Sequence, residues 1–269
     1  MKLLAIIIVI IIVGIAGFYA FNDYIYQQKQ LGGMTPVPTI PKMDNTTYQI
    51  TPISHASFVL HLAGQTIYND PVGGAEAYKG QDTPSMILVS DIHGDHMDPD
   101  TLKAISSPET VIIVPQAVKD KLPTDIPGKM VVMKNGEKGT QNGISIEAIP
   151  MYNIPESQNA MHTKGRGNGY VLEAGGKRIY IAGDTDATPE MKALANIDVA
   201  FVPMNPPYTM NVEEAADGVV AFKPKVVIPY HYRTPNGLSD TNKFKELVEA
   251  KDPNIKVELL NFYSGTQVK

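Results

Sequence analysis

The chain contains no cysteine in its 269 residues. This absence excludes disulfide bonds, thiolate metal ligands and cysteine nucleophiles. A metal site in this protein must therefore be built from histidine, aspartate, glutamate or backbone groups. The absence of cysteine also suits an oxidising compartment, without identifying one.

An excess of positive charge is absent as well. Lys and Arg number 23 against 28 Asp and Glu, which gives a formal net charge of −5. Proteins that bind nucleic acid over a broad surface normally show a basic excess, so we expect no nucleic-acid partner. The length allows one sizeable domain, or an anchor followed by one domain.

Residues 3–21 form an almost unbroken apolar run. Nineteen residues at about 1.5 Å each span roughly 28 Å, which is close to the thickness of a bilayer's hydrocarbon core. A cleaved signal peptide usually has a shorter apolar core and a cleavage site of small residues, and here Gly14-Ile15-Ala16 lies inside the run. We therefore predict a transmembrane anchor over residues 1–21, with a cleaved signal segment as the alternative.

Residues 22–47 are expected to be a tether. They contain Gly32-Gly33 and three closely spaced prolines, and they show little apolar periodicity. Lys2 before the apolar run favours a cytoplasmic N-terminus and a domain outside the cytoplasm. If the segment is cleaved, a secreted or periplasmic protein is expected instead. The folded domain should comprise residues 48–269.

The domain should have a layered α/β fold. Apolar and β-branched segments come first, with a hairpin connection at Ala63-Gly64-Gln65, and strands then alternate with helices. Two helices should begin alike, at Asp98-Pro99 and at Thr188-Pro189, because each pair places a capping side chain before a proline. The strands are expected at residues 48–53, 57–62, 66–69, 86–89, 111–114, 131–133, 144–149, 170–173, 178–182, 199–202, 226–230 and 256–260.

A dense polar motif follows the apolar run at residues 85–89. Its six residues, Asp91-Ile92-His93-Gly94-Asp95-His96, contain two imidazoles and two carboxylates. Burial of unpaired charge is costly, and a cation is the simplest common partner for such groups. A solvated polar turn is the alternative interpretation.

Further candidate ligands lie in loops or at strand ends later in the chain. Asp184 follows a predicted strand, His162 lies in a long polar loop, and His231 ends another strand. The carboxyl ends of strands are where α/β sheets usually bind ligands. Of the six histidines, His61 lies within an alternating strand and is expected to be structural, whereas His55 lies in a turn.

This order of residues resembles the metallo-β-lactamase-fold hydrolases, and within them the ascorbate-6-phosphate lactonase-like branch. Ser54-His55-Ala56-Ser57, Asn69-Asp70-Pro71 and Gly167-Asn168-Gly169-Tyr170 also fit that branch. The resemblance covers the domain from about residue 48 to the end. It implies an αββα four-layer sandwich with a dinuclear metal site, usually zinc, at one edge of the sheets.

The resemblance also assigns the ligands. His93 and His162 would belong to the first metal site, Asp95, His96 and His231 to the second, and Asp184 would bridge the pair. Asp91 departs from the family's usual pattern, which has histidine at this position. A carboxylate can bind zinc, but it changes the charge and hardness of the site, so Mn²⁺ or Fe²⁺ is an alternative. Asp91 could instead orient an imidazole. His55 and Asp70 are expected to support the ligands.

The ligand set predicts hydrolysis by a metal-bound hydroxide. Two metals about 3.5–4 Å apart can hold a bridging hydroxide and polarise a carbonyl or phosphoryl group. Asp95 and Asp184 are the expected catalytic carboxylates, and Asp95 would orient a proton of the attacking water. Substrate contacts are expected from loop residues, with a solvated role as the alternative for each: Lys164, Arg166, Arg233 and Tyr208.

The leading functional hypothesis is a hydrolase acting on a small-molecule lactone, amide or phosphoester. A phospholipid phosphodiesterase at the membrane and a non-catalytic metal-binding envelope protein are the alternatives. Asp91 and the absence of cysteine both argue against a true β-lactamase. The oligomeric state is not predicted.

Overall fold

Alternate side chains of β2 (Ser57–Leu62) face two different apolar cores. Phe58, Leu60 and Leu62 join the larger core, and Val59 between them joins the smaller one. This is the period of two that a pleated strand imposes on its side chains. A strand with apolar residues on both faces must be covered on both sides, and this requirement fixes the layers of the domain.

The computed structural model describes residues 48–264, and these fold around two large sheets. The first sheet has the order β1-β2-β3-β4-β5-β6. Its first three strands are antiparallel neighbours, and β3 to β6 are parallel. Besides β2, its strands are β1 (Tyr48–Ser54), β3 (Gln65–Asn69), β4 (Met86–Leu88), β5 (Val111–Val114) and β6 (Lys129–Val132).

The second sheet has the order β15-β12-β11-β10-β9-β8-β7. Its strands β7 to β10 are antiparallel neighbours, and β10, β11, β12 and β15 are parallel. Its members are β7 (Lys138–Gln141), β8 (Ile144–Met151), β9 (Gly167–Ala174), β10 (Lys177–Ile181), β11 (Val199–Pro203), β12 (Val226–Tyr230) and β15 (Lys256–Val257). A separate pair joins β13 (Arg233–Thr234) to β14 (Gly237–Leu238).

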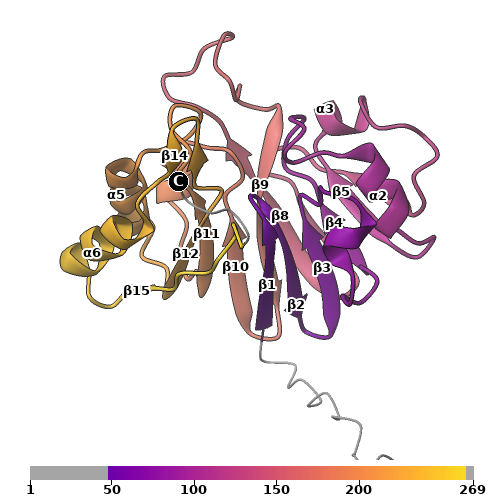
Figure 1. Ribbon diagram of the computed structural model, residues 1–269, viewed down its shortest axis with the longest axis horizontal. Helices are drawn as coiled ribbons and strands as arrows, with labels where there is room; N and C mark the ends of the chain where they lie inside the picture. Colours follow the sequence, from indigo (N-terminus) through magenta and orange to yellow (C-terminus); the bar gives the residue numbers. More distant parts are fainter. Residues whose placement is uncertain (1–47, 265–269) are drawn as a thin grey trace, which may run out of the picture. The chain divides into compact units, whose positions relative to one another are not determined.

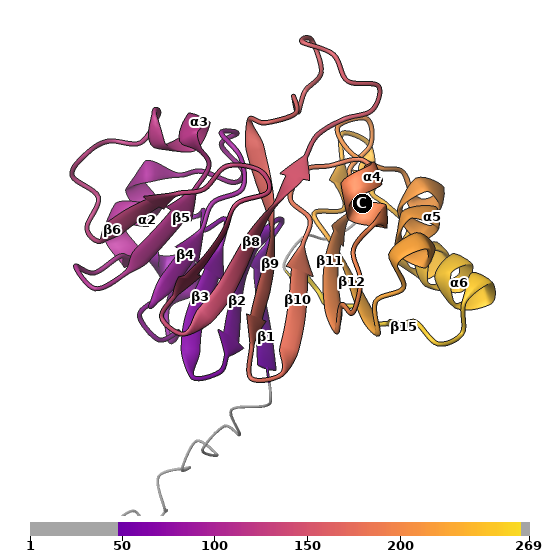
Figure 2. The same ribbon diagram turned by 180° about the vertical axis from the view of Figure 1, so that it is seen from behind.

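Helices cover the outer face of each sheet (Figures 1 and 2). On the first sheet, Leu102 of α2 (Pro99–Ile105) and Val118 of α3 (Gln116–Lys119) close the smaller core. On the second, α5 (Val212–Phe222) and α6 (Thr241–Lys251) contribute to the larger core. Two short helices, η1 (Ala75–Tyr78) and α4 (Pro189–Lys192), complete the described elements. The predicted α/β fold is confirmed, with both sheets between helical layers.

The helix starts agree with the predicted capping residues. Asp98 accepts hydrogen bonds from the backbone of α2, and Thr188 does the same for α4. Asn211 and Glu214 form a reciprocal capping box at the start of α5. Several strand bounds differ from the predicted ones: the last strand ends at Val257 instead of residue 260, and β9 begins at Gly167 instead of residue 170. The strand β7 was not predicted.

Within residues 48–264, no helix is long and apolar enough to cross a membrane. The anchor predicted over residues 1–21 and the tether over residues 22–47 lie outside the described residues. Both remain predictions, as does the extension of the domain to residue 269.

Candidate metal centre

The polar motif after β4 is a tight turn fixed by backbone hydrogen bonds. The amides of His96 and Met97 both donate to the carbonyl of His93, at 3.0 and 2.9 Å. Asp91 and His96 are fully buried, so the solvated-turn interpretation does not describe them. The turn then enters α2 through its cap, Asp98. Strand, turn and capped helix therefore direct the side chains of Asp91 and His96 toward the interior.

His96, Asp184 and His231 form one cluster, although they come from both sheets. Asp184 follows β10, and its two oxygens lie 3.3 Å from His96 Nε2 and 3.3 Å from His231 Nε2. The two Nε2 atoms are 3.1 Å apart. Asp95 adds a carboxylate at the edge, with Oδ2 3.4 Å from His231 Nε2. Donor atoms from these four residues therefore converge on one point.

Neighbouring polar groups fix the imidazoles of this cluster. His96 Nδ1 lies 2.9 Å from Asp70 Oδ2, and Asp70 is itself held by the amide and hydroxyl of Ser90, both at 2.7 Å. A carboxylate at Nδ1 keeps the proton there and leaves Nε2 free to bind a cation. The side-chain amide nitrogen of Asn205 lies 3.2 Å from His231 Nδ1 and supports that ring at its Nδ1 edge.

A second cluster contains Asp91, His93 and His162. Asp91 Oδ2 lies 2.6 Å from His93 Nδ1 and 3.8 Å from His162 Nε2. Asn153 Oδ1 accepts a hydrogen bond from the His162 backbone amide at 2.9 Å and lies 3.2 Å from its Nδ1, so the ring is fixed. Asp184 Oδ2 lies 3.2 Å from His162 Nε2. Asp184 thus touches both clusters, as expected of a bridging carboxylate.

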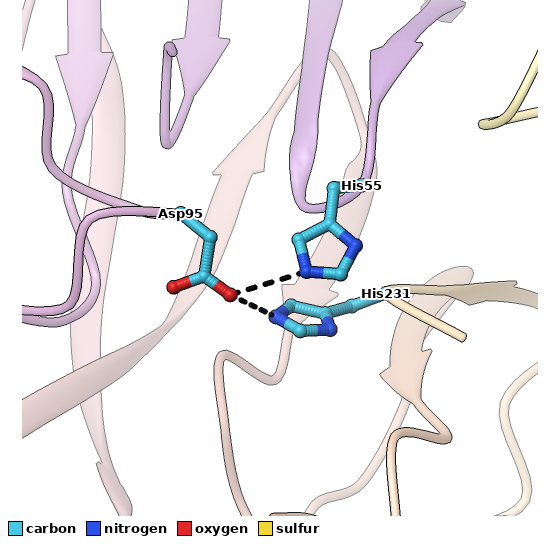
Figure 3. Close-up of side chains that lie close together, drawn as sticks. All are labelled: His55, Asp95 and His231. Atoms are coloured by element: carbon cyan, nitrogen blue, oxygen red, sulfur yellow. Dashed lines mark hydrogen bonds and ion pairs between the residues drawn. The ribbon is translucent and has the colours of Figure 1, made fainter. Parts of the chain in front are cut away.

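His55 lies beside the cluster of His96, Asp184 and His231 (Figure 3). Its Nε2 is 3.1 Å from Asp95 Oδ2, and its Nδ1 is 2.6 Å from the hydroxyl of Tyr263. Its ring centroid is 3.8 Å from that of His231. The β1–β2 turn places His55 here in a left-handed conformation, with φ of 56°. His55 therefore positions Asp95 and packs against His231.

The electrostatics of the centre favour positive charge. Burial lowers the pKa of His96, but the charges of Asp184 and Asp70 outweigh it and raise the pKa well above its ordinary value. Burial raises the pKa of Asp184, but His231 and His96 outweigh it and hold the pKa well below its usual range. The same carboxylates that stabilise a proton on an imidazole would also stabilise a metal ion at that position.

The donor atoms fit a metal ion. His162 Nε2 and Asp184 Oδ1 are buried without a hydrogen-bond partner, a state that is costly unless another group satisfies them. The Nε2 atoms of His96 and His231 lie 3.1 Å apart, so one ring donates a hydrogen bond to the other, and a metal ion could take the place of that proton. Imidazole and carboxylate are ligands of zinc, and also of manganese and iron. Three groups of donors are close enough to share an ion: His55, Asp95 and His231; Asp91, His93 and His162; and His96, Asp184 and His231.

A pocket of about 500 Å³ opens onto these groups. Its volume suits a small molecule. Both clusters and the rim contribute to its lining: His55, His93, Asp95, Met161, His162, Asp184, Asn205, Tyr208, Arg233, Thr234 and Pro235.

The four residues predicted to contact substrate occupy different places. Tyr208 and Arg233 line the pocket, and the Arg233 guanidinium lies 4.6 Å from the ring centroid of Tyr263. Arg166 forms a two-pronged pair with Asp91. Lys164 lies 2.9 Å from Glu190 and 3.3 Å from Glu156, and it does not line the pocket. Contact with substrate remains a prediction for all four.

The supporting residues that were not predicted from the sequence include Ser90, Asn153 and Tyr263. Ser90 precedes the polar motif directly, so its position was a usable signal. Asn153 and Tyr263 gave none, because a lone polar residue in a loop or near the end of a chain has no distinguishing spacing.

Comparison with known proteins agrees with this geometry. The profile of the beta-lactamase superfamily domain matches residues 49–231. A UPF0173 metal-dependent hydrolase of Thermococcus onnurineus is 30% identical over 208 residues, covering 74% of this chain and 91% of the relative. One from Carboxydothermus hydrogenoformans is 31% identical over 218 residues, covering 78% and 96%.

Solved structures show the same fold. A crystal structure described as a metal-dependent hydrolase, from Parabacteroides distasonis, is 38% identical with a TM-score of 0.69, covering 79% of this chain and 92% of that one. Igni18, a metallo hydrolase of Ignicoccus hospitalis, is 24% identical with a TM-score of 0.66, covering 80% and 96%, and supports the fold alone. Together with the converging donors, these matches show that the chain belongs to the β-lactamase superfamily and is a metal-dependent hydrolase of the metallo-β-lactamase fold.

Proposed function

We propose that this protein hydrolyses a small-molecule lactone, amide or phosphoester with the help of two metal ions, zinc being the first candidate. The observation that carries the proposal is that His162 Nε2 and Asp184 Oδ1, buried without hydrogen-bond partners, belong to residues that line an open pocket. His93, His162 and Asp91 would hold one ion, and Asp95, His96 and His231 the other, with Asp184 between them. When bound, such ions lower the pKa of water and polarise the bond to be cleaved.

Asp95 is suited to orient the attacking water. It lines the pocket, and 43% of its side chain is exposed. Burial raises its pKa, but hydrogen bonds from His231 and His55 outweigh this effect and hold the pKa far below its usual range. A carboxylate that stays ionised accepts a hydrogen bond from water but does not store its proton. Asp95 therefore fixes the direction of attack, while the proton passes to the leaving group or to solvent.

The ascorbate-6-phosphate lactonase-like branch is the part of the superfamily that we propose for this chain. A substrate of that kind combines a cyclic ester with an anionic group. Arg233 at the rim offers positive charge to such an anion, and its position over the Tyr263 ring restricts its motion.

Substitution of single ligands tests the proposal. We expect His93→Ala, His96→Ala and Asp184→Ala each to abolish turnover across a panel of lactones, amides and phosphodiesters, and to lower the metal content. Circular dichroism should show that the fold persists. His61→Ala is the matched control, because His61 lies in β2 outside both clusters, with its Nδ1 3.3 Å from the Thr66 hydroxyl. Retained turnover in all three ligand variants would contradict the proposal.

A phospholipid substrate is the second candidate. Ile154 and Met161 are 48% and 46% exposed in the loop before β9, and Met161 also lines the pocket. Apolar side chains at the mouth would contact acyl chains, and the predicted anchor would hold the domain at a bilayer. Faster hydrolysis of phosphodiester lipids than of lactones would favour this candidate. Bound metal without hydrolysis of any panel member would instead favour a non-catalytic metal-binding protein of the cell envelope.

A further inference from the structure

We propose that the two metal sites differ in affinity, because Arg166 pairs with Asp91 and thereby weakens metal binding at the first site. This inference rests on the proposed metal-dependent function. The site of Asp95, His96, Asp184 and His231 would bind its ion tightly. The site of Asp91, His93 and His162 would fill only at higher metal concentration.

Asp91 is already engaged by strong partners. Arg166 Nε donates to Asp91 Oδ1 at 3.2 Å, and Arg166 Nη2 donates to Oδ2 at 3.1 Å. His93 Nδ1 lies 2.6 Å from the same Oδ2. A carboxylate oxygen offers about two lone-pair directions, so these two contacts saturate Oδ2. Oδ2 is also the oxygen that lies 3.8 Å from His162 Nε2, so a metal between these residues must displace one of the bonds.

In the other cluster, the close partners of the Asp95 and Asp184 carboxylates are imidazoles, whose protons a metal ion can replace. Asp184 Oδ1 has no hydrogen-bond partner, and the Nε2 atoms of His96 and His231 face each other. Asp70 holds His96 from the opposite side of the ring, through Nδ1. A metal ion entering here replaces protons shared among imidazoles and carboxylates, whereas a metal ion at Asp91 must displace the permanent charge of Arg166.

Charge acts in the same direction as geometry. Asp91 is fully buried and only 20% of the Arg166 side chain is exposed, so water screens the pair weakly. The guanidinium cancels the charge that Asp91 adds and repels a second cation. With Arg166 included, the first site has no net charge, like a site of three neutral imidazoles. Its carboxylate donor, Asp91, nevertheless remains bound to Arg166.

The backbone fixes Arg166 in this position. The Arg166 amide donates to the carbonyl of Thr163 at 3.2 Å. Two residues on, the amide of Asn168 in β9 donates to the carbonyl of Ser90 at 3.0 Å, next to Asp91 in the chain. The loop that carries Arg166 is therefore joined to the loop that carries Asp91, and the pairing belongs to the fold.

Zinc titration of the full-length, chelator-treated protein tests the inference. Calorimetry should give one tight event and a second that is weaker by about tenfold or more, or undetected. Arg166→Met removes the positive charge and both hydrogen bonds to Asp91. It should strengthen the second binding event by about tenfold, or bring that event into the measurable range. Lys164→Met is the matched control: it removes a cation from the same loop that does not touch either cluster, and should change neither event.

A second variant covers the case in which Arg166→Met does not fold. Combining Arg166→Met with Asp91→His places three imidazoles in the first site and should give two events of similar affinity. Two equally tight sites in the unmodified protein would overturn the inference, as would failure of both variants, correctly folded, to strengthen the second event. Absence of binding of zinc, Mn²⁺ and Fe²⁺ would refute the proposed function itself, whereas unequal binding without turnover would leave the inference standing.

Discussion

The chemistry of each imidazole depends on which of its nitrogens is taken by a neighbour. His96, His162 and His231 each have Nδ1 against a side chain, namely that of Asp70, Asn153 or Asn205. Their Nε2 atoms point toward the carboxylates of the centre. Asp70 and the Asn153 oxygen accept from Nδ1 and so leave Nε2 of His96 and His162 free to bind a metal, whereas the Asn205 amide nitrogen holds the His231 ring in place.

Asp91 gives a prediction for acid stability. Burial raises its pKa, but the hydrogen bond from His93 and the charges of nearby imidazoles and Arg166 outweigh it and lower the pKa to about 2. Because this value lies below that of an unfolded aspartate, the contribution to stability is present above about pH 4 and is lost as the pH falls toward 2. Asp91→Asn should cost the metal-free protein about 2 kcal/mol at pH 6, and this difference should shrink below pH 4.

Urea unfolding in the presence of chelator at pH 6, 4 and 3 measures this effect. Asp125→Asn is the control, because Asp125 pairs with Lys103 on the surface, where an ion pair contributes little. A cost of Asp91→Asn that is constant from pH 6 to pH 3 would contradict the assignment.

The residues proposed as ligands could be found in the sequence, as could their partners His55 and Asp70, but the pairing of Arg166 with Asp91 could not. Asp91 and Asp184 stand where apolar strands end, and hydrophobic periodicity locates those ends. Arg166 lies in the loop between β8 and β9, where no strand or helix periodicity predicts the direction of a side chain. Its pairing with Asp91 spans 75 residues, and only the packed structure reveals it.

At the scale of elements, the centre joins two units of the same design. β4 leads through the polar turn into α2, and β10 leads through Asp184 into α4. In both units a capping side chain and a proline begin the helix, and these local signals were readable in the sequence. β7 was not readable, because its residues are mostly exposed and polar and so lack apolar alternation.

The cap of α2 should matter for the centre as well as for the helix. Asp98 accepts hydrogen bonds from the amides of Asp100 and Thr101, at 3.1 and 3.3 Å, and it lies two residues after His96. Asp98→Ala should cost about 1 kcal/mol of stability and should also weaken zinc binding, because the turn loses its anchor.

Asp240→Ala provides the comparison. Asp240 caps α6 by accepting from the Lys243 amide at 2.9 Å, and α6 covers the outer face of the second sheet. This variant should lose similar stability, measured by thermal unfolding, with unchanged zinc affinity. Equal zinc affinities in the two variants would show that the α2 cap does not support the metal centre.

At the scale of the whole domain, the centre exists only when both sheets have packed. His55, Asp70 and His96 come from turns of the first sheet, whereas Asp184 and His231 follow strands of the second. Metal binding should therefore be coupled to folding of residues 48–264. The sheets and their order follow from apolar periodicity, but the register that brings these side chains within about 3 Å follows from packing between the sheets.

We expect the N-terminal segment to be separable from catalysis. β1 begins at Tyr48 and ends beside His55, so the seven-residue strand places the start of the domain about 20 Å from the pocket. If residues 1–21 anchor the protein, removing residues 1–47 should release it from membranes while leaving kcat/KM for a water-soluble substrate unchanged. Ile8→Lys with Ile11→Lys is the matched full-length variant, because two charges oppose insertion of the apolar run. Fractionation and mass measurement distinguish an anchor from a cleaved signal. Unmodified protein found intact in the soluble fraction would contradict the anchor, and lost turnover in a folded truncated chain would contradict the separation.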